Sequence, residues 1–228
     1  MPFVPLHDEN PRRYVTAHFV TIGLIAANIV LWLFGEAGGT ALSAAYGFGV
    51  VPARLFEDAE LPDDLAQVAP VLTLVTYQFL HGGVLHLAFN MLFAWVFADN
   101  VEDALGHGRF LLFWLVCGGV AGIVHAIAEP GSVVPMIGAS GAISGILGAY
   151  AVLYPRARIL VLAFGVVPIR LPALVTIAAW FLQDLLWATA GTSGREDVAL
   201  WAHIGGFVAG AALILPFRWR LVPAGPWR

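Results

Sequence analysis

Six apolar segments of membrane-spanning length divide this chain of 228 residues. A segment of about 20 mostly apolar residues can cross the hydrocarbon core of a bilayer. The segments cover approximately residues 16–34, 80–98, 110–128, 132–154, 171–189 and 199–216. Since a backbone in lipid must satisfy its own hydrogen bonds, each segment is predicted to be a helix. The predicted fold class is therefore all-α, a polytopic membrane bundle of six transmembrane helices.

The composition agrees with a membrane protein. The chain is 60% hydrophobic and 11% charged, with a mean hydropathy of +0.83, whereas soluble domains are about 45–50% apolar and about 25% charged. All eleven basic residues are arginine, which excludes a catalytic lysine. Cys117 is the single cysteine, so no internal disulfide can form. A zinc site needs several thiol or imidazole ligands, and no HExxH motif is present. We expect no metal and no cofactor.

Short polar turns join the segments, so residues 1–228 are predicted to form a single domain. The 36–70 connection is longer and acidic, which is typical of a structured or interfacial loop. The 159–170 stretch is too short to span and is interpreted as a connection at the inner interface. Residues 1–10 lack the basic start of a signal peptide.

Arginine bias predicts the orientation in the membrane. With the N-terminus inside, nine of the eleven arginines fall on the inner side and two on the outer side. Both termini are then cytoplasmic, since the number of spans is even. The expected localisation is an integral membrane protein with the lipid bilayer as its surroundings, and no nucleic-acid partner is expected.

Small residues line two of the predicted helices. Glycines recur in the fourth span at spacings of three and four and recur again in the sixth span, which places each set on one helical face. Small faces let helix backbones approach closely in lipid. The predicted packing glycines are Gly138, Gly141, Gly145 and Gly148 in the fourth span and Gly206 and Gly210 in the sixth.

Ser140 is predicted to lie below the membrane surface. Pro135 and Gly138 disfavour an earlier helix start, and a helix over 140–154 rises only about 22 Å against a core of about 30 Å. Irregular backbone at that depth is tolerated where protein buries it or water lines it. A helix N-terminus also favours negative charge, as an oxyanion requires.

His203 lies about one turn into the sixth span, at the same outer side as Ser140. An ionisable residue inside a span is a functional candidate, although a structural hydrogen bond is an equally open reading. Serine becomes a nucleophile when a base takes its proton, and histidine is the usual base. The two glycine faces would bring Ser140 and His203 together.

The second span opens with His86 and Asn90, which are four residues apart on one helical face. Both side chains carry N–H groups that suit a tetrahedral oxyanion. The alternative is that they bond to each other or to loop carbonyls. His81 and His125 are open to a structural role. Asp184, an acid inside the fifth span, is able in principle to orient His203, but the sequence does not place it there.

These motifs resemble those of the rhomboid family of intramembrane serine proteases. The carriers are "GASG" at 138–141, "HLAFN" at 86–90 and "AHIGG" at 202–206, and "NVEDALG" after the second span resembles the family's inner-loop acid at Glu102. The resemblance covers nearly the whole chain. Two features depart from it: no tryptophan–arginine pair occurs in the first outer loop, and Ser144 stands where some members stack an aromatic ring on the histidine.

The resemblance implies a catalytic dyad with Ser140 as nucleophile and His203 as general base and then acid. It also implies an oxyanion hole of His86, Asn90 and the Ser140 backbone N–H, and a bacterial inner membrane location with the active site on the outer side. The expected function is cleavage of single-span membrane proteins near the outer end of their span. The alternative is a pseudoprotease scaffold that binds transmembrane clients. A transporter is disfavoured because the two halves show no internal repeat.

Overall fold

The computed structural model of this chain describes residues 3–57, 62, 65, 67–190 and 199–221. Each of the six apolar segments contains a helix, and these helices are α1 (Phe19–Ala37), α5 (Val84–Leu105), α6 (His107–Ala128), α7 (Ser140–Leu153), α8 (Ala173–Ala190) and α9 (Leu200–Ile214). The predicted helical membrane bundle is confirmed. Among the described residues, four helical segments are long and apolar enough to cross a membrane, namely Phe19–Ala37, Val84–Leu105, His107–Ala128 and Leu200–Leu221. The apolar parts of α7 and α8 are shorter.

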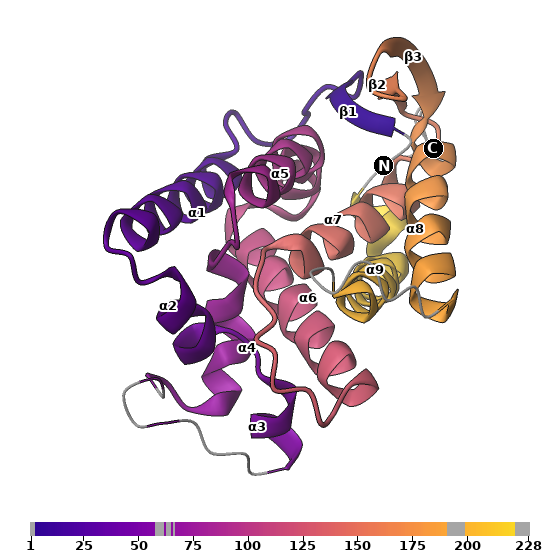
Figure 1. The fold of residues 1–228 in the computed structure, drawn as a ribbon. Coiled ribbons are helices and arrows are strands. Elements are labelled where there is room, and N and C mark those ends of the chain that lie inside the picture. The colour runs from indigo at the N-terminus through magenta and orange to yellow at the C-terminus, as the bar shows by residue number, and fades with distance from the viewer. Residues whose placement is uncertain (1–2, 58–61, 63–64, 66, 191–198, 222–228) are drawn as a thin grey trace.

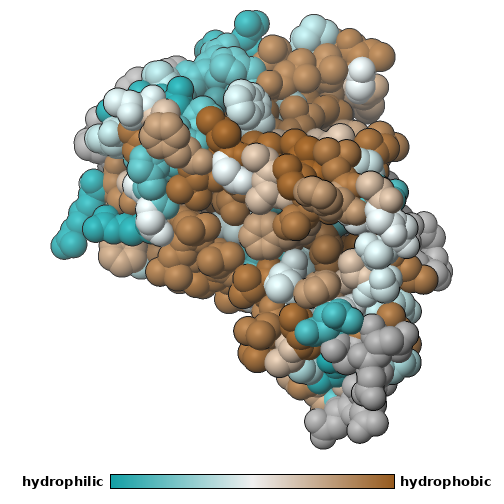
Figure 2. Space-filling view, turned by 90° about the vertical axis from the view of Figure 1, so that its left-hand side faces the viewer, coloured by the Kyte–Doolittle hydropathy of each residue, from teal (hydrophilic) through white to brown (hydrophobic). Residues whose placement is uncertain are grey.

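The outer surface of the bundle suits lipid. Large apolar side chains stand exposed along the helices, among them Phe34 on α1, Leu112 and Ile127 on α6, and Leu186 on α8. Figure 2 shows a broad hydrophobic area across the middle of one face, with hydrophilic residues at its upper-left and lower edges. Soluble monomers rarely expose apolar area on this scale. The exposure is accounted for when acyl chains cover the helices.

The short helix α7 lies at the centre of the bundle, where it packs against α5, α6, α8 and α9 (Figure 1). Most of its residues are buried, including Ile146, Tyr150 and Leu153, and the others are half-buried. A short helix surrounded on all sides ends within the protein. Its first residue, Ser140, is half-buried.

The described part of the 36–70 connection, which leaves out residues 58–61, 63, 64 and 66, is structured. It forms α2 (Ala41–Phe48) and α3 (Pro52–Phe56), and it leads into η1 (Pro70–Leu72), α4 (Thr73–Thr76) and η2 (Tyr77–Phe79). Val50 exchanges two backbone hydrogen bonds with Met136, at 3.0 and 2.7 Å. This bridge fixes the segment that leads into α7.

A small sheet at one end of the bundle was not predicted from the sequence. The strands are β1 (Phe3–Asp8), β2 (Arg158–Ala163) and β3 (Val167–Pro172), paired antiparallel in the order β1-β2-β3. The 159–170 stretch is thus a β-hairpin that joins α7 to α8, with a turn at Phe164 and Gly165, which both have positive φ. Figure 1 shows the sheet at the top of the view, beside α8. The helix η3 (Leu215–Phe217) and then α10 (Arg218–Leu221) follow α9.

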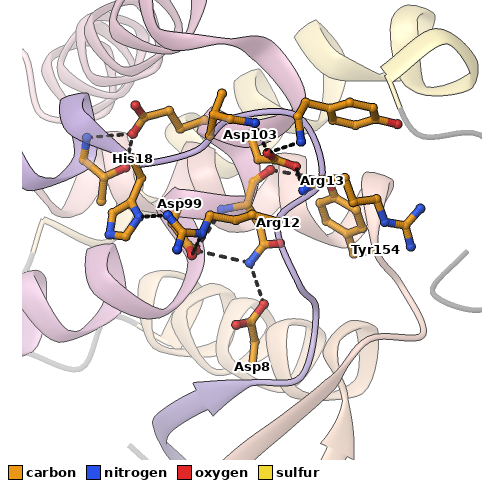
Figure 3. Close-up of polar contacts among 12 residues, drawn as sticks. Asp8, Arg12, Arg13, His18, Asp99, Asp103 and Tyr154 are labelled. Carbon is orange, nitrogen blue, oxygen red and sulfur yellow. Dashed lines mark hydrogen bonds and ion pairs between the residues drawn. The ribbon is translucent and has the colours of Figure 1, made fainter.

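Two acidic side chains of α5 hold the segment that joins β1 to α1. Asp103 accepts hydrogen bonds from the backbone N–H groups of Arg13, Tyr14 and Val15, at 2.7–2.8 Å. Figure 3 shows Asp103 beside the backbone of Arg13. Glu102, which is fully buried, accepts from two N–H groups in the first turn of α1. Because those groups have no partner within their own helix, Glu102 caps α1.

Asp8 ties the sheet to the helical bundle. Its Oδ2 accepts hydrogen bonds from Asn100 Nδ2 and Tyr150 Oη, both at 2.7 Å. Burial is the largest cause that raises the pKa of Asp8, to about 7, from 3.8. The indole N–H of Trp180 on α8 also donates to the Phe3 carbonyl, at 3.0 Å. The first strand therefore contacts α5, α7 and α8 together.

Candidate active site

Ser140 is the first residue of α7, and the backbone before it requires glycine. Gly138 has φ of +125°, a conformation that side-chain-bearing residues rarely adopt. A Cβ at Gly138 would lie 2.8 Å from two ring atoms of His86 and 3.8 Å from Ser140 Oγ. The Gly138 N–H donates to the Tyr77 carbonyl at 3.0 Å. Gly138 thus lets the chain turn into α7 beside the His86 ring.

The backbones of α7 and α9 are in direct contact. A Cβ at Gly206 would lie 2.0 Å from the Gly141 carbonyl oxygen, and a Cβ at Gly210 would lie 2.0 Å from that of Gly145. The position of a Cβ at Gly141 is also 3.9 Å from the Ala202 carbonyl oxygen. The residue after Ser140 therefore lies against the residue before His203.

His203 lies in the first turn of α9 and contacts α8. Its ring Nδ1 is 2.9 Å from Oδ2 of Asp184, and both side chains are mostly withdrawn from solvent, with exposed fractions of 16% and 20%. The two residues line a small cavity of about 30 Å³, together with Ser144 and Phe207. A cavity of this size has room for a water molecule. Asp184 therefore contacts the His203 ring, whereas Ser144 offers that ring no aromatic partner.

His86 and Asn90 lie in the first two turns of α5. The His86 ring is in edge contact with that of His81, with centroids 5.1 Å apart. The Asn90 side-chain amide donates to the His86 carbonyl at 2.8 Å. This bond matches the structural alternative for Asn90, but an amide carries two N–H groups and the bond uses one. The role of both residues in an oxyanion hole stays a prediction.

The predicted residues fall into two groups around α7. Ser140 and His86 meet at Gly138, and His203 meets Asp184. Ser140 and His203, both of which the structure describes, share no hydrogen bond in it, so the dyad stays a prediction. Within the described part of the chain, no three His, Cys, Asp or Glu side chains cluster as metal ligands would.

Tyr77 is a positioning residue that sequence reasoning missed. It is almost fully buried, its hydroxyl donates to the Gly118 carbonyl at 2.7 Å, and its own carbonyl receives the Gly138 N–H. These two hydrogen bonds connect the turn before Ser140 to α6. The signal in the sequence is weak: polar residues at 76–78 directly precede an apolar span.

The fold and these contacts define a polytopic helical membrane protein with a serine and a histidine on two helices in backbone contact. The family model of the Rhomboid domain matches residues 69–220, which is more than half of the chain. The chain belongs to the rhomboid family.

Three relatives illustrate the similarity. "Rhomboid protein 1, mitochondrial" of Saccharomyces cerevisiae is 32% identical over 151 residues, covering 63% of this chain and 41% of the yeast protein. "Rhomboid protease GluP" of Bacillus subtilis is 36% identical over 145 residues, covering 63% of this chain and 26% of GluP. "Putative rhomboid protease YdcA" of the same organism is 29% identical over 151 residues, covering 64% and 67%. The match spans less than half the length of the first two relatives.

Proposed function

We propose that this chain is an intramembrane serine endopeptidase that cuts single-span membrane proteins near the outer end of their span. One observation carries the proposal: α7 and α9 touch at their backbones, with Gly141 against Ala202. Two helices in such contact keep Ser140 and His203 at a set separation. Family membership and the protease names of two relatives support the same conclusion.

In the proposed reaction His203 takes the proton of Ser140, and the serine oxygen attacks the scissile carbonyl. The histidine then gives that proton to the leaving amine, and water releases the acyl group by the same steps. The Ser140 N–H has no acceptor within α7, because it belongs to the first turn. It is free to stabilise the oxyanion, together with donors from His86 and Asn90.

The substrate class follows from where the site lies. Ser140 stands at the end of a short helix that is surrounded by other helices, so a soluble chain would reach it poorly. A substrate helix must unwind before its peptide bond is open to attack. Relative to alanine, glycine in its outer turn lowers the free energy of unwinding by about 1 kcal/mol and proline lowers it by about 3 kcal/mol. We propose that such helices enter beside α8, with the site on the outer side and both termini in the cytoplasm.

The test is cleavage of a panel of single-span substrates by the purified protein in detergent and in liposomes. Ser140→Ala and His203→Ala should each abolish cleavage, and Ser140→Ala should keep the wild-type unfolding temperature. Mass spectrometry of the products should place the cut in the outer turn of the substrate. Turnover by Ser140→Ala, or cuts at the inner end, would refute the assignment. Client binding without cleavage by the wild type would favour the pseudoprotease scaffold.

A further inference from the structure

Asp184 and His203 form a pair between α8 and α9. The Oδ2 to Nδ1 distance is 2.9 Å. Among the residues that the structure describes, His203 is the only ion-pair partner of Asp184. A carboxylate within an apolar helix is costly unless a partner offsets its desolvation. The imidazole of His203 is that partner.

We propose that Asp184 is a positioning residue for His203, which it holds in the tautomer and orientation that leave Nε2 free to accept a proton. The proposal rests on the protease function proposed above. An ionised carboxylate only accepts hydrogen bonds, so its contact with Nδ1 requires that Nδ1 carry the hydrogen. In a neutral imidazole the proton is then absent from Nε2, which is the acceptor that a general base needs.

The same contact stabilises the charged histidine during the reaction. When Nε2 takes the Ser140 proton, both ring nitrogens carry hydrogen and the ring becomes positive. Asp184 then faces a full positive charge across 2.9 Å in a site of low solvent exposure, where electrostatic attraction is stronger than in water. The proton passes on to the leaving amine, and Asp184 takes no part in its transfer.

The packing of α8 against α9 does not depend on this pair alone. Phe181 and Phe207 stack with ring centroids 4.4 Å apart and an angle of 25° between their planes. Trp180 is buried, and its indole N–H donates a hydrogen bond to the Phe3 carbonyl of β1. Replacing the Asp184 carboxylate by an amide of the same shape should leave these contacts in place. A change in catalysis can therefore be separated from a loss of structure.

The first experiment compares kinetic constants of the full chain in liposomes. Asp184→Asn should lower kcat at least about tenfold and change KM less than about twofold, because it acts on a transition-state charge and on the tautomer. Asp184→Glu should restore part of kcat. Glu36→Gln, which removes an exposed carboxylate of α1, is the matched control and should change neither constant. A kcat of Asp184→Asn within twofold of the wild type would overturn the proposal.

The second experiment does not depend on activity. Protein with ¹⁵N-labelled histidine is studied by NMR at neutral pH, and the signal that His203→Gln removes belongs to His203. We expect hydrogen on Nδ1 in the wild type and a shift of the tautomer population toward Nε2–H in Asp184→Asn. Hydrogen on Nε2 in the wild type would refute the inference even if the protein is a protease. If the wild type cleaves no substrate, the proposed protease function is refuted. The spectrum still tests whether Asp184 sets the tautomer of His203.

Discussion

A methyl group added to Gly206 tests how closely α7 and α9 must approach. The Cβ of Gly206→Ala would lie 2.0 Å from the Gly141 carbonyl oxygen, whereas ordinary contacts begin at about 3.4 Å. The two helices would have to separate locally by the difference, about 1.4 Å. The two nearest atoms, the carbonyl oxygen of Gly141 at 2.0 Å and its carbonyl carbon at 3.0 Å, belong to the backbone, so no side-chain rotation can relieve the clash.

The size of the effect follows from two opposing terms. Overpacking of a well-packed core costs about 1–3 kcal/mol, and the cost is highest where backbones must shift. Alanine recovers up to about 1 kcal/mol as a better helix former than glycine. We expect a net loss of about 2 kcal/mol in the free energy of unfolding, which raises the unfolded fraction about 30-fold. Gly119→Ala in α6, where nothing lies within 4 Å of the new Cβ, is the matched control and should be neutral or stabilising.

The single cysteine provides the assay. Cys117 is fully buried against α7, so a thiol-reactive fluorescent dye reports unfolding from one known position. Cleavage should also fall in Gly206→Ala, by about 100-fold, because a misplacement of about 1 Å between reacting groups costs that much. If Gly206→Ala proves as stable as Gly119→Ala, the close approach of α7 and α9 is refuted.

Three further predictions concern other contacts. His86→Ala and Asn90→Ala should each lower the cleavage rate about 100- to 1000-fold, with an unchanged unfolding temperature. The loss of activity should be partial because a backbone donor to the oxyanion remains. Wild-type rates in both variants would assign the two residues a structural role. The raised pKa of Asp8, about 7, means that the stability this group gives β1 is full below about pH 4 and is lost as pH rises through 7. Hydrogen exchange of β1 should therefore accelerate by up to about tenfold per pH unit over that window relative to Asp8→Asn; equal rates in both would contradict this. Glu102→Ala should destabilise the protein by about 3 kcal/mol in the dye assay, because it leaves two N–H groups in the first turn of α1 and the buried Thr21 hydroxyl without their acceptor. The exposed Glu36→Ala should have little effect.

The membrane bundle was predictable because its signal is local. Each apolar run of sufficient length must form a helix in lipid, whatever the rest of the chain does. The start of α7 at Ser140 is local in the same way, since Pro135 and Gly138 disfavour a helix before it. The spacing of the glycines also fixed which faces of α7 and α9 could meet.

The small sheet was not predictable from such signals. The strands β2 and β3 are six residues each, too short to separate from an apolar connection by periodicity. The partner of β2 is β1, which pairs Phe3 with Ala163, 160 positions later in the chain. A pairing at that distance depends on how the helices between the strands bring their ends together.

The sequence by itself determined the residue types of the candidate site: a serine at a helix start, a histidine near the start of another helix, and glycine faces between them. Only the tertiary structure decided which neighbours these side chains have. It placed Asp184 2.9 Å from Nδ1 of His203 and Tyr77 against the turn at Gly138. Helix position is set by nearby residues along the chain, whereas a contact between side chains depends on the rotation and packing of separate helices, which no local pattern encodes.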